Sequence, residues 1–152
     1  MDTDKIKSFI INLLTKNPEG YILNKIKDLI KKPPLQIDRL IKTVPKSPGV
    51  YLIYNRVHKK EDFIYVGETD DLSRRLKGDI SRGKRRYHTF LKMISSESTS
   101  ENKIKEIIRN DYLFSYILTE SKESAFIIEG ILIRTYYKNL CNKIKKYQKL
   151  VN

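Results

Sequence analysis

The chain has 152 residues, and its 31 lysines and arginines against 18 aspartates and glutamates give a formal net charge of +13 at neutral pH. That length predicts one domain of about 100–200 residues with at most a small appendage. The 39% of apolar residues suffices for a hydrophobic core, which excludes the disordered and collagen-like classes. The charge surplus predicts a polyanionic partner, either nucleic acid or anionic lipid.

We expect neither a membrane span nor a signal peptide in this sequence. No apolar run approaches the roughly 18 residues of a membrane span, and the first residues lack the apolar stretch of a signal peptide. The single cysteine, Cys141, allows no internal disulfide. We therefore expect an intracellular, cytoplasmic protein without a membrane partner.

Residues 1 to 46 are expected to form a separate helical N-terminal region, because apolar residues recur there at helical spacing. The turn-forming residues 17 to 21 and the pair Pro33-Pro34 divide this region into three short helices. Three such helices resemble a helix-turn-helix, whose last helix would present Gln36, Arg39 and Lys42 to DNA. The alternative is a helical cap on the main domain, residues 47 to 152.

After Pro48 the apolar pattern changes to a period of two, which is typical of strands. Residues 50 to 54 and 63 to 66 flank a charged stretch, residues 55 to 62, and predict a β-hairpin with a long loop. A hairpin symmetric about His58 pairs Tyr51 directly with Tyr65. Both positions have the same parity, so both hydroxyls are expected on one face of the sheet.

The rest of the chain predicts mainly helices. We expect helices near residues 71–81, 85–96, 102–109 and 121–137, a strand near 112–119, and a basic tail at 138–149 that holds five lysines and no acid. In the first of these helices Arg75 borders the apolar stripe Leu72, Leu76 and Ile80. An arginine aimed at the two tyrosines is suited to binding phosphate, and the alternative is an ion pair with Asp79.

Glu129 falls in the middle of the apolar arc of the last helix. A buried carboxylate is costly unless it is protonated, paired or bound to a metal. It is therefore either the partner of a buried arginine or a ligand for a divalent cation, with magnesium the default for a hard oxygen site. The neighbouring Gly130 lowers helix propensity and suggests the close approach of another element.

The densest basic patch holds four cations in the five residues 82 to 86. Contacts to a phosphate backbone explain such a patch and predict salt-dependent binding, whereas the alternative is a solvated helix face. We expect the tail lysines to extend this surface. The candidate DNA-binding residues are Arg82, Lys84, Arg85, Arg86, Lys143, Lys145 and Lys146, with Arg39 and Lys42 added by the N-terminal region.

Five elements in order resemble the GIY-YIG nucleases, and most closely their UvrC excision-repair branch. They are Pro48-Gly49-Val50-Tyr51, Ile64-Tyr65-Val66-Gly67, Asp71-Leu72-x-x-Arg75-Leu76, Ile127-Ile128-Glu129 and Asn142. The resemblance implies an α+β fold, in which a small three-stranded mixed or antiparallel sheet is flanked by helices. It also implies hydrolysis of DNA phosphodiesters with one divalent cation, Mg²⁺ or Mn²⁺.

The resemblance further implies a role for each matching residue. Tyr51 is the candidate general base, Tyr65 positions water and phosphate, Arg75 binds phosphate, Glu129 is the metal ligand and Asn142 closes the domain near the site. A phenol with a pKa near 10 is only about 0.1% ionised at pH 7. The cation and Arg75 are therefore expected to lower the pKa of Tyr51.

Two positions depart from the usual pattern of this family. Asp79 stands where many members have histidine or tyrosine, and Glu68 stands where the excision-repair branch usually has lysine. His88 resembles a second catalytic histidine of some phage and homing members, and the alternative is an ordinary surface histidine in a basic helix. The departures leave open a catalytically weak or inactive DNA-binding protein with the same fold. Double-strand cutting by one site per chain would need two successive nicks or a homodimer.

Overall fold

The computed structural model describes residues 33–56 and 63–136. The first two predicted N-terminal helices, the centre of the hairpin loop and the basic tail lie outside these residues. Asn142, Lys143, Lys145 and Lys146 lie outside them as well, so the expectations for these residues stay predictions.

The core of the fold is a three-stranded antiparallel sheet in the order β2-β1-β3. Its strands are β1 (Gly49–Asn55), β2 (Phe63–Thr69) and β3 (Tyr112–Leu118). The predicted α+β class is thereby confirmed, and the sheet is antiparallel rather than mixed. The central strand β1 is buried from Gly49 to Tyr54, because elements cover both faces of the sheet.

The predicted register of the β1-β2 hairpin is wrong. Tyr51 stands opposite Gly67, and Tyr65 stands opposite Ile53. Tyr54 pairs with Phe63, and a β-bulge lies between Ile53 and Tyr54, which adds one residue to β2. Compared with the predicted pairing, the register is shifted by one residue at the loop end and by a second residue at the bulge. An offset of two leaves side-chain parity unchanged, so Tyr51 and Tyr65 still share a face.

The helices follow the predicted order, except that the helix predicted near residues 85–96 is divided in two. The chain is helical from residue 72 to 80, although Arg74–Ile80 form the π-helical turn η1. The single helix predicted near 85–96 is instead a short 3₁₀ turn, η2, and a separate helix, α4, because His88 between them is extended and its side chain caps α4. The helices beyond η1 are η2 (Arg85–Tyr87), α4 (Thr89–Met93), α5 (Glu101–Asp111) and α6 (Lys122–Tyr136).

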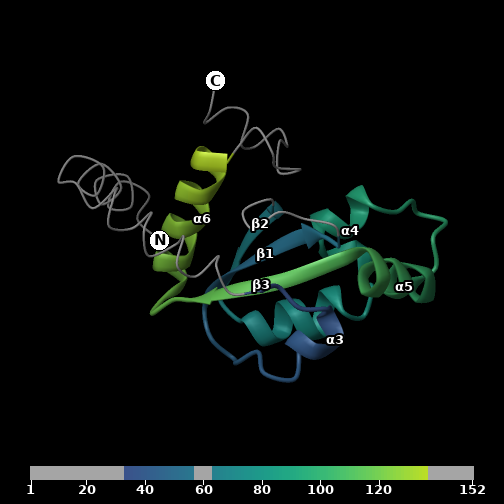
Figure 1. Ribbon diagram of the computed structural model, residues 1–152, viewed down its shortest axis with the longest axis horizontal. Coiled ribbons are helices and arrows are strands. Elements are labelled where there is room, and N and C mark those ends of the chain that lie inside the picture. Colours follow the sequence, from purple (N-terminus) through teal and green to yellow (C-terminus); the bar gives the residue numbers. More distant parts are fainter. Residues whose placement is uncertain (1–32, 57–62, 137–152) are drawn as a thin grey trace.

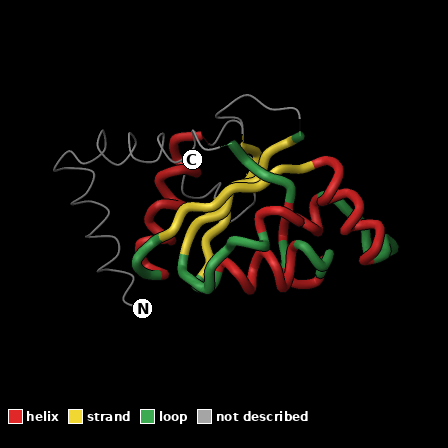
Figure 2. Tube along the Cα trace, turned by 60° about the horizontal axis from the view of Figure 1, so that its bottom comes forward, coloured by secondary structure: helices red, strands yellow, loops and turns green. Residues whose placement is uncertain are grey.

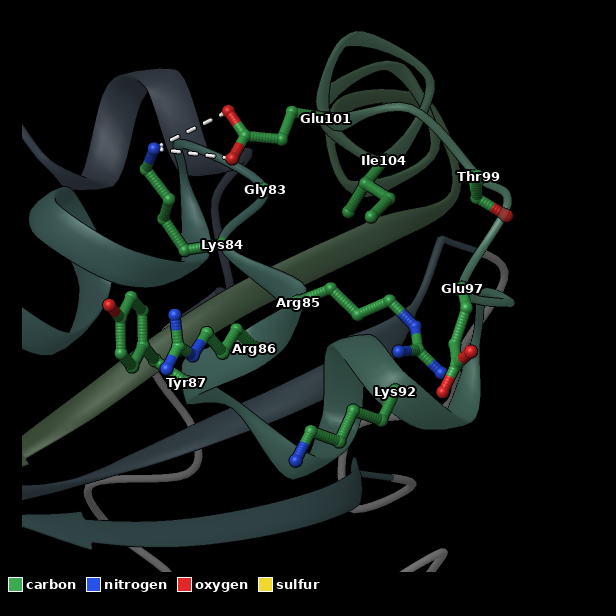
Figure 3. A pocket seen from close by; sticks show the side chains of 10 residues that line it. All are labelled: Gly83, Lys84, Arg85, Arg86, Tyr87, Lys92, Glu97, Thr99, Glu101 and Ile104. Atoms are coloured by element: carbon green, nitrogen blue, oxygen red, sulfur yellow. Dashed lines mark hydrogen bonds and ion pairs between the residues drawn. The ribbon is translucent and has the colours of Figure 1, made fainter.

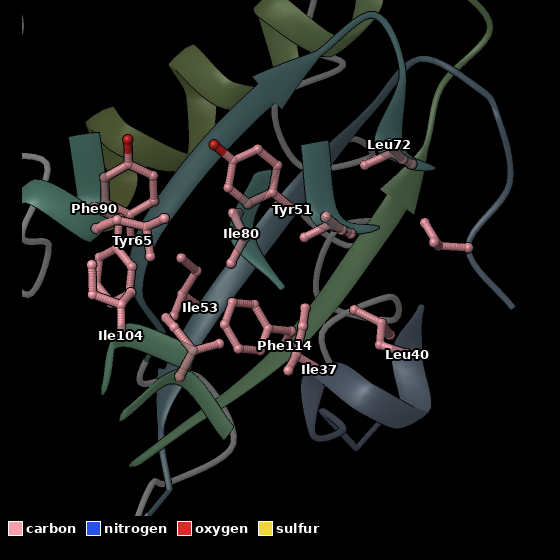
Figure 4. Packing of buried hydrophobic residues seen from close by; sticks show 14 residues of the cluster. Ile37, Leu40, Tyr51, Ile53, Tyr65, Leu72, Ile80, Phe90, Ile104 and Phe114 are labelled. Atoms are coloured by element: carbon pink, nitrogen blue, oxygen red, sulfur yellow. The ribbon is translucent and has the colours of Figure 1, made fainter. Parts of the chain in front are cut away.

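Helices cover the two faces of the sheet unequally. Figures 1 and 2 show α6 on one side, where it packs on β1 and β2, and the other described helices on the opposite side. The α6 side buries Val50, Leu52 and Val66. The opposite side forms the larger cluster, in which Tyr51 and Tyr65 lie with the buried residues of η1, α4 and α5 (Figure 4). No helix in the described ranges is long and apolar enough to cross a membrane.

The described end of the N-terminal region packs on the sheet. The main chains of Leu35 and Phe114 exchange two hydrogen bonds of 2.8 and 2.7 Å. Helix α3 (Ile37–Leu40) buries Ile37 and Leu40 in the larger cluster and leaves Arg39 exposed. The helix-turn-helix stays a prediction, because its first two helices are outside the described residues.

Candidate active site

Two stacked tyrosines form the centre of the candidate site. The rings of Tyr51 on β1 and Tyr65 on β2 have centroids 6.3 Å apart and an interplanar angle of 23°. Only 3% of Tyr51 and 7% of Tyr65 are exposed. Figure 4 shows their hydroxyls pointing to the same side of the cluster. The expectation that both hydroxyls share one face is confirmed even though the two residues are diagonal rather than opposite.

Gly67 allows Tyr51 to lie across β2. A Cβ atom at residue 67 would be 2.1 Å from Cζ and 2.2 Å from Oη of Tyr51. Any side chain there would therefore displace the phenol. Gly130 differs, because a Cβ atom there meets no atom within 4 Å beyond its own helical turn in the described structure. No element among residues 33–56 and 63–136 therefore makes the expected close approach to Gly130.

His88 lies beside both tyrosines and is 4% exposed, so the surface alternative for this residue is wrong. Its Nε2 is 2.6 Å from Oη of Tyr51, and its Nδ1 accepts a hydrogen bond of 3.1 Å from the N–H of Phe90. Burial, assisted by the charge of Arg75, lowers the pKa of His88 to about 3. Neutral His88 with an accepting Nδ1 carries its proton on Nε2, so it donates to the oxygen of Tyr51.

The lowered pKa of His88 predicts a pH-dependent stability. Between pH 6.5 and pH 3 the folded state binds fewer protons than the unfolded state. The contribution of neutral His88 to the free energy of unfolding is therefore fully present above pH 6.5 and decreases as the pH falls below it. We expect the free energy of unfolding of the wild type to fall, relative to His88→Asn, by about 2 kcal/mol between pH 7 and pH 5. Urea unfolding of both proteins at each pH measures this difference. Parallel losses in the two proteins would contradict it.

Arg75 on η1 faces the same group. Its Nη1 donates to the carbonyl of Tyr87 at 3.1 Å and to Oδ2 of Asp79 at 3.3 Å, so the predicted ion pair is present. Its Nε is buried and has no hydrogen-bond partner among the described residues. The ion pair therefore leaves other N–H groups of the guanidinium, that of Nε among them, available for an anion.

Glu129 connects α6 to the edge strand β2. It is 5% exposed, and its Oε2 accepts a hydrogen bond of 2.7 Å from the main-chain N–H of Glu68. Oε2 of Glu68 is itself buried without a hydrogen-bond partner among the described residues. Two carboxylates thus stand at one end of β2, and the sequence alone indicated only Glu129 as a site residue.

The charges around Tyr51 oppose its ionisation. Burial raises the pKa of Tyr51 well above its ordinary value, Tyr65, Glu129 and Glu68 raise it further, and Arg75 lowers it. Burial, followed by the charge of Glu129, raises the pKa of Tyr65 to about 12. Arg75 acts as expected on Tyr51, but burial outweighs it. Without a further positive charge, both phenols stay neutral.

The residues present fit a hard divalent cation. Within the described ranges no three histidine, cysteine, aspartate or glutamate side chains gather as a metal-binding group. Mg²⁺ commonly takes one or two carboxylates and completes its shell with water and phosphate oxygens. The buried carboxylate of Glu129 and the unpartnered Oε2 of Glu68 match that donor set.

Three residues of the predicted basic cluster, Lys84, Arg85 and Arg86, line an open pocket of about 620 Å³ (Figure 3). Lys84 pairs with Glu101 at 3.2 Å, Nε of Arg85 donates to Oγ of Ser95 at 3.1 Å, and Arg86 stands 5.8 Å from the ring centroid of Tyr87. Arg82 and Arg86 are exposed. The cluster connects to Arg75 through Tyr87, whose carbonyl accepts a hydrogen bond from Arg75.

The structure brings together five of the six predicted catalytic residues. Tyr51, Tyr65, Arg75, His88 and Glu129 interact through rings, hydrogen bonds or charge. Asn142 lies outside the described residues. Arg39 and Lys42 are exposed near α3, on a different element from the basic cluster. The carbonyl of Tyr87, which positions Arg75, is a main-chain contact that no sequence pattern signals.

This antiparallel sheet, with the motifs in this order around it, is a GIY-YIG-type domain. Within that class the chain is similar to the UvrABC system protein C, UvrC. It is 33% identical to the protein of Clostridioides difficile (strain 630) over 100 residues, and 35% identical to that of Clostridium botulinum (strain Hall) over 112 residues. These matches span 66% and 74% of this chain and confirm the resemblance.

The chain spans about 14% of the length of these curated relatives. No family model matches it. Among solved structures, it is 24% identical to the GIY-YIG N-terminal endonuclease domain of UvrC from Thermotoga maritima, which is bound to magnesium. That comparison covers 68% of this chain and 92% of the domain, with a TM-score of 0.42.

Proposed function

We propose that this protein is a divalent-metal-dependent DNA endonuclease that hydrolyses phosphodiester bonds inside the cell. The observation that carries the proposal is the pair of unpartnered buried atoms around Tyr51. Nε of Arg75 needs an acceptor, and Oε2 of Glu68 needs a donor or a cation. A phosphodiester together with Mg²⁺ or Mn²⁺ supplies both, because the phosphate is an acceptor and the metal is a cation.

Tyr51 is the proposed general base for the attacking water. His88 donates to the oxygen of Tyr51 from Nε2, so the hydroxyl proton must point elsewhere, and the same hydrogen bond stabilises the phenolate. A cation bound at Glu129 lowers the pKa of nearby water and phenol groups. With its own proton already released to solvent, the phenolate of Tyr51 would take the proton of the water, and Tyr65, 6.3 Å away from ring to ring, would position that water and the phosphate.

Arg75 is the proposed phosphate ligand. Its contacts with Asp79 and the carbonyl of Tyr87 fix the guanidinium while Nε stays available. A fixed cation at that place stabilises the charge that develops on the phosphate in the transition state. Asp79 thereby holds Arg75 in position instead of removing it from the site.

The basic cluster is the proposed backbone-binding surface. Arg82, Lys84, Arg85 and Arg86 adjoin the site through Tyr87, and we assign the tail lysines and the exposed Arg39 and Lys42 to the same task. Each neutralised phosphate releases counterions, which makes binding weaken steeply with salt. Asn142 is proposed to close the domain near the site. A homodimer follows if both strands are cut at once.

Incubation of supercoiled plasmid with the full chain and Mg²⁺ or Mn²⁺ tests the proposal. We expect conversion to nicked and linear forms, which EDTA stops and which added Mg²⁺ restores. DNA binding without any nicking, measured at the same salt concentration, would instead identify a DNA-binding protein that has kept the fold. Glu68 and Asp79 differ from the usual residues of the family at these positions, and an inactive DNA-binding protein is therefore the alternative to test.

A further inference from the structure

Glu68, a second residue with a carboxylate, contacts Glu129 through its main chain. It follows Gly67 in β2, and its own main-chain N–H donates to Oε2 of Glu129 at 2.7 Å. The two residues are therefore linked directly, one through its main chain and the other through its side chain. A substitution that changes only the side chain of Glu68 keeps this link.

The side chain of Glu68 has an unusual environment. Its Oε2 is buried and lacks a hydrogen-bond partner among the described residues. A buried polar atom left without a partner costs about 1–3 kcal/mol, and more when the group is charged. Its charge, like that of Glu129, also opposes the ionisation of Tyr51. A divalent cation held by these carboxylates would offset both effects.

We propose that Glu68 supplies a second carboxylate oxygen to the divalent cation held at Glu129. The inference rests on the proposed function, which places the cation there. One doubly charged cation neutralises both carboxylates and satisfies the unpartnered Oε2. Two carboxylates bind a divalent cation more tightly than one, because affinity rises with the number of charged ligands. The chain therefore binds its cation in the absence of DNA.

Binding of Mn²⁺ to the full chain without DNA tests this inference independently of catalysis. Electron paramagnetic resonance counts free Mn²⁺ and gives the dissociation constant. We expect Glu68→Gln to raise this constant by about 10- to 100-fold. Glu106→Gln on the exposed face of α5 makes the same charge change and is expected to leave the constant unchanged. Glu129→Gln is expected to abolish binding.

The outcomes separate the two proposals. If Glu129→Gln abolishes binding while Glu68→Gln binds as tightly as the wild type, the role of Glu68 is overturned and the cation site at Glu129 stands. If the wild type binds no Mn²⁺, both are overturned. Melting temperatures without metal establish that each variant is folded, and Glu68→Ser provides a second removal of the carboxylate.

Discussion

Glu129→Gln is expected to reduce plasmid nicking by about 10³-fold or more while binding of DNA persists. The substitution removes the negative charge that holds the cation but keeps the shape of the side chain. The amide oxygen of glutamine still accepts the hydrogen bond from the N–H of Glu68, so the connection between α6 and β2 survives. Nicking rates with saturating Mg²⁺ and fluorescence anisotropy with labelled DNA measure the two quantities.

Glu123→Gln is the matched control for that experiment. Glu123 is an exposed carboxylate in the first turn of the same helix, so the change in net charge is identical. We expect it to nick DNA at the wild-type rate. Wild-type nicking by Glu129→Gln would show that this carboxylate does not hold the cation. Loss of DNA binding together with a lower melting temperature would assign Glu129 a structural role.

The local patterns of the sequence suffice to predict the strands β1 and β2 but not the register in which these strands pair. Alternation of apolar residues predicts β1 and β2, and parity puts Tyr51 and Tyr65 on one face. The bulge between Ile53 and Tyr54 has no signal in that alternation, and together with the shift at the loop end it places Gly67 opposite Tyr51. The glycine of the second motif therefore has a steric reason that only the true register reveals.

The position of His88 is a second feature that the sequence alone does not predict. Basic residues around it favour a continuous helix, but its Nδ1 accepts the N–H of Phe90 and starts a new helix there. The contact of its Nε2 with Tyr51 joins residues 37 positions apart, and no local pattern encodes such a contact. The same holds for Glu68, whose unpartnered oxygen depends on the packing of α6 against the end of β2.

The contact between His88 and Tyr51 leads to the second large expected effect. Tyr51→Phe should lower single-turnover cleavage by about 10²–10⁴-fold, the usual contribution of a general base. The phenyl ring keeps the stacking on Tyr65 and the packing over Gly67. Only the oxygen is lost, so the effect belongs to the hydroxyl and not to the fold.

The pH dependence of the rate distinguishes a base from a residue that only fixes the geometry. Burial keeps the pKa of Tyr51 high, so the wild-type rate should rise with pH across the neutral range, and Tyr51→Phe should lose that rise. Tyr54→Phe removes a hydroxyl from the same strand on the opposite face of the sheet and should keep both the rate and its pH profile. A Tyr51→Phe variant that retains the wild-type slope at a lower rate would assign the proton transfer to another group. Tyr51 would then be a residue that positions the water, with His88 holding its hydroxyl in place.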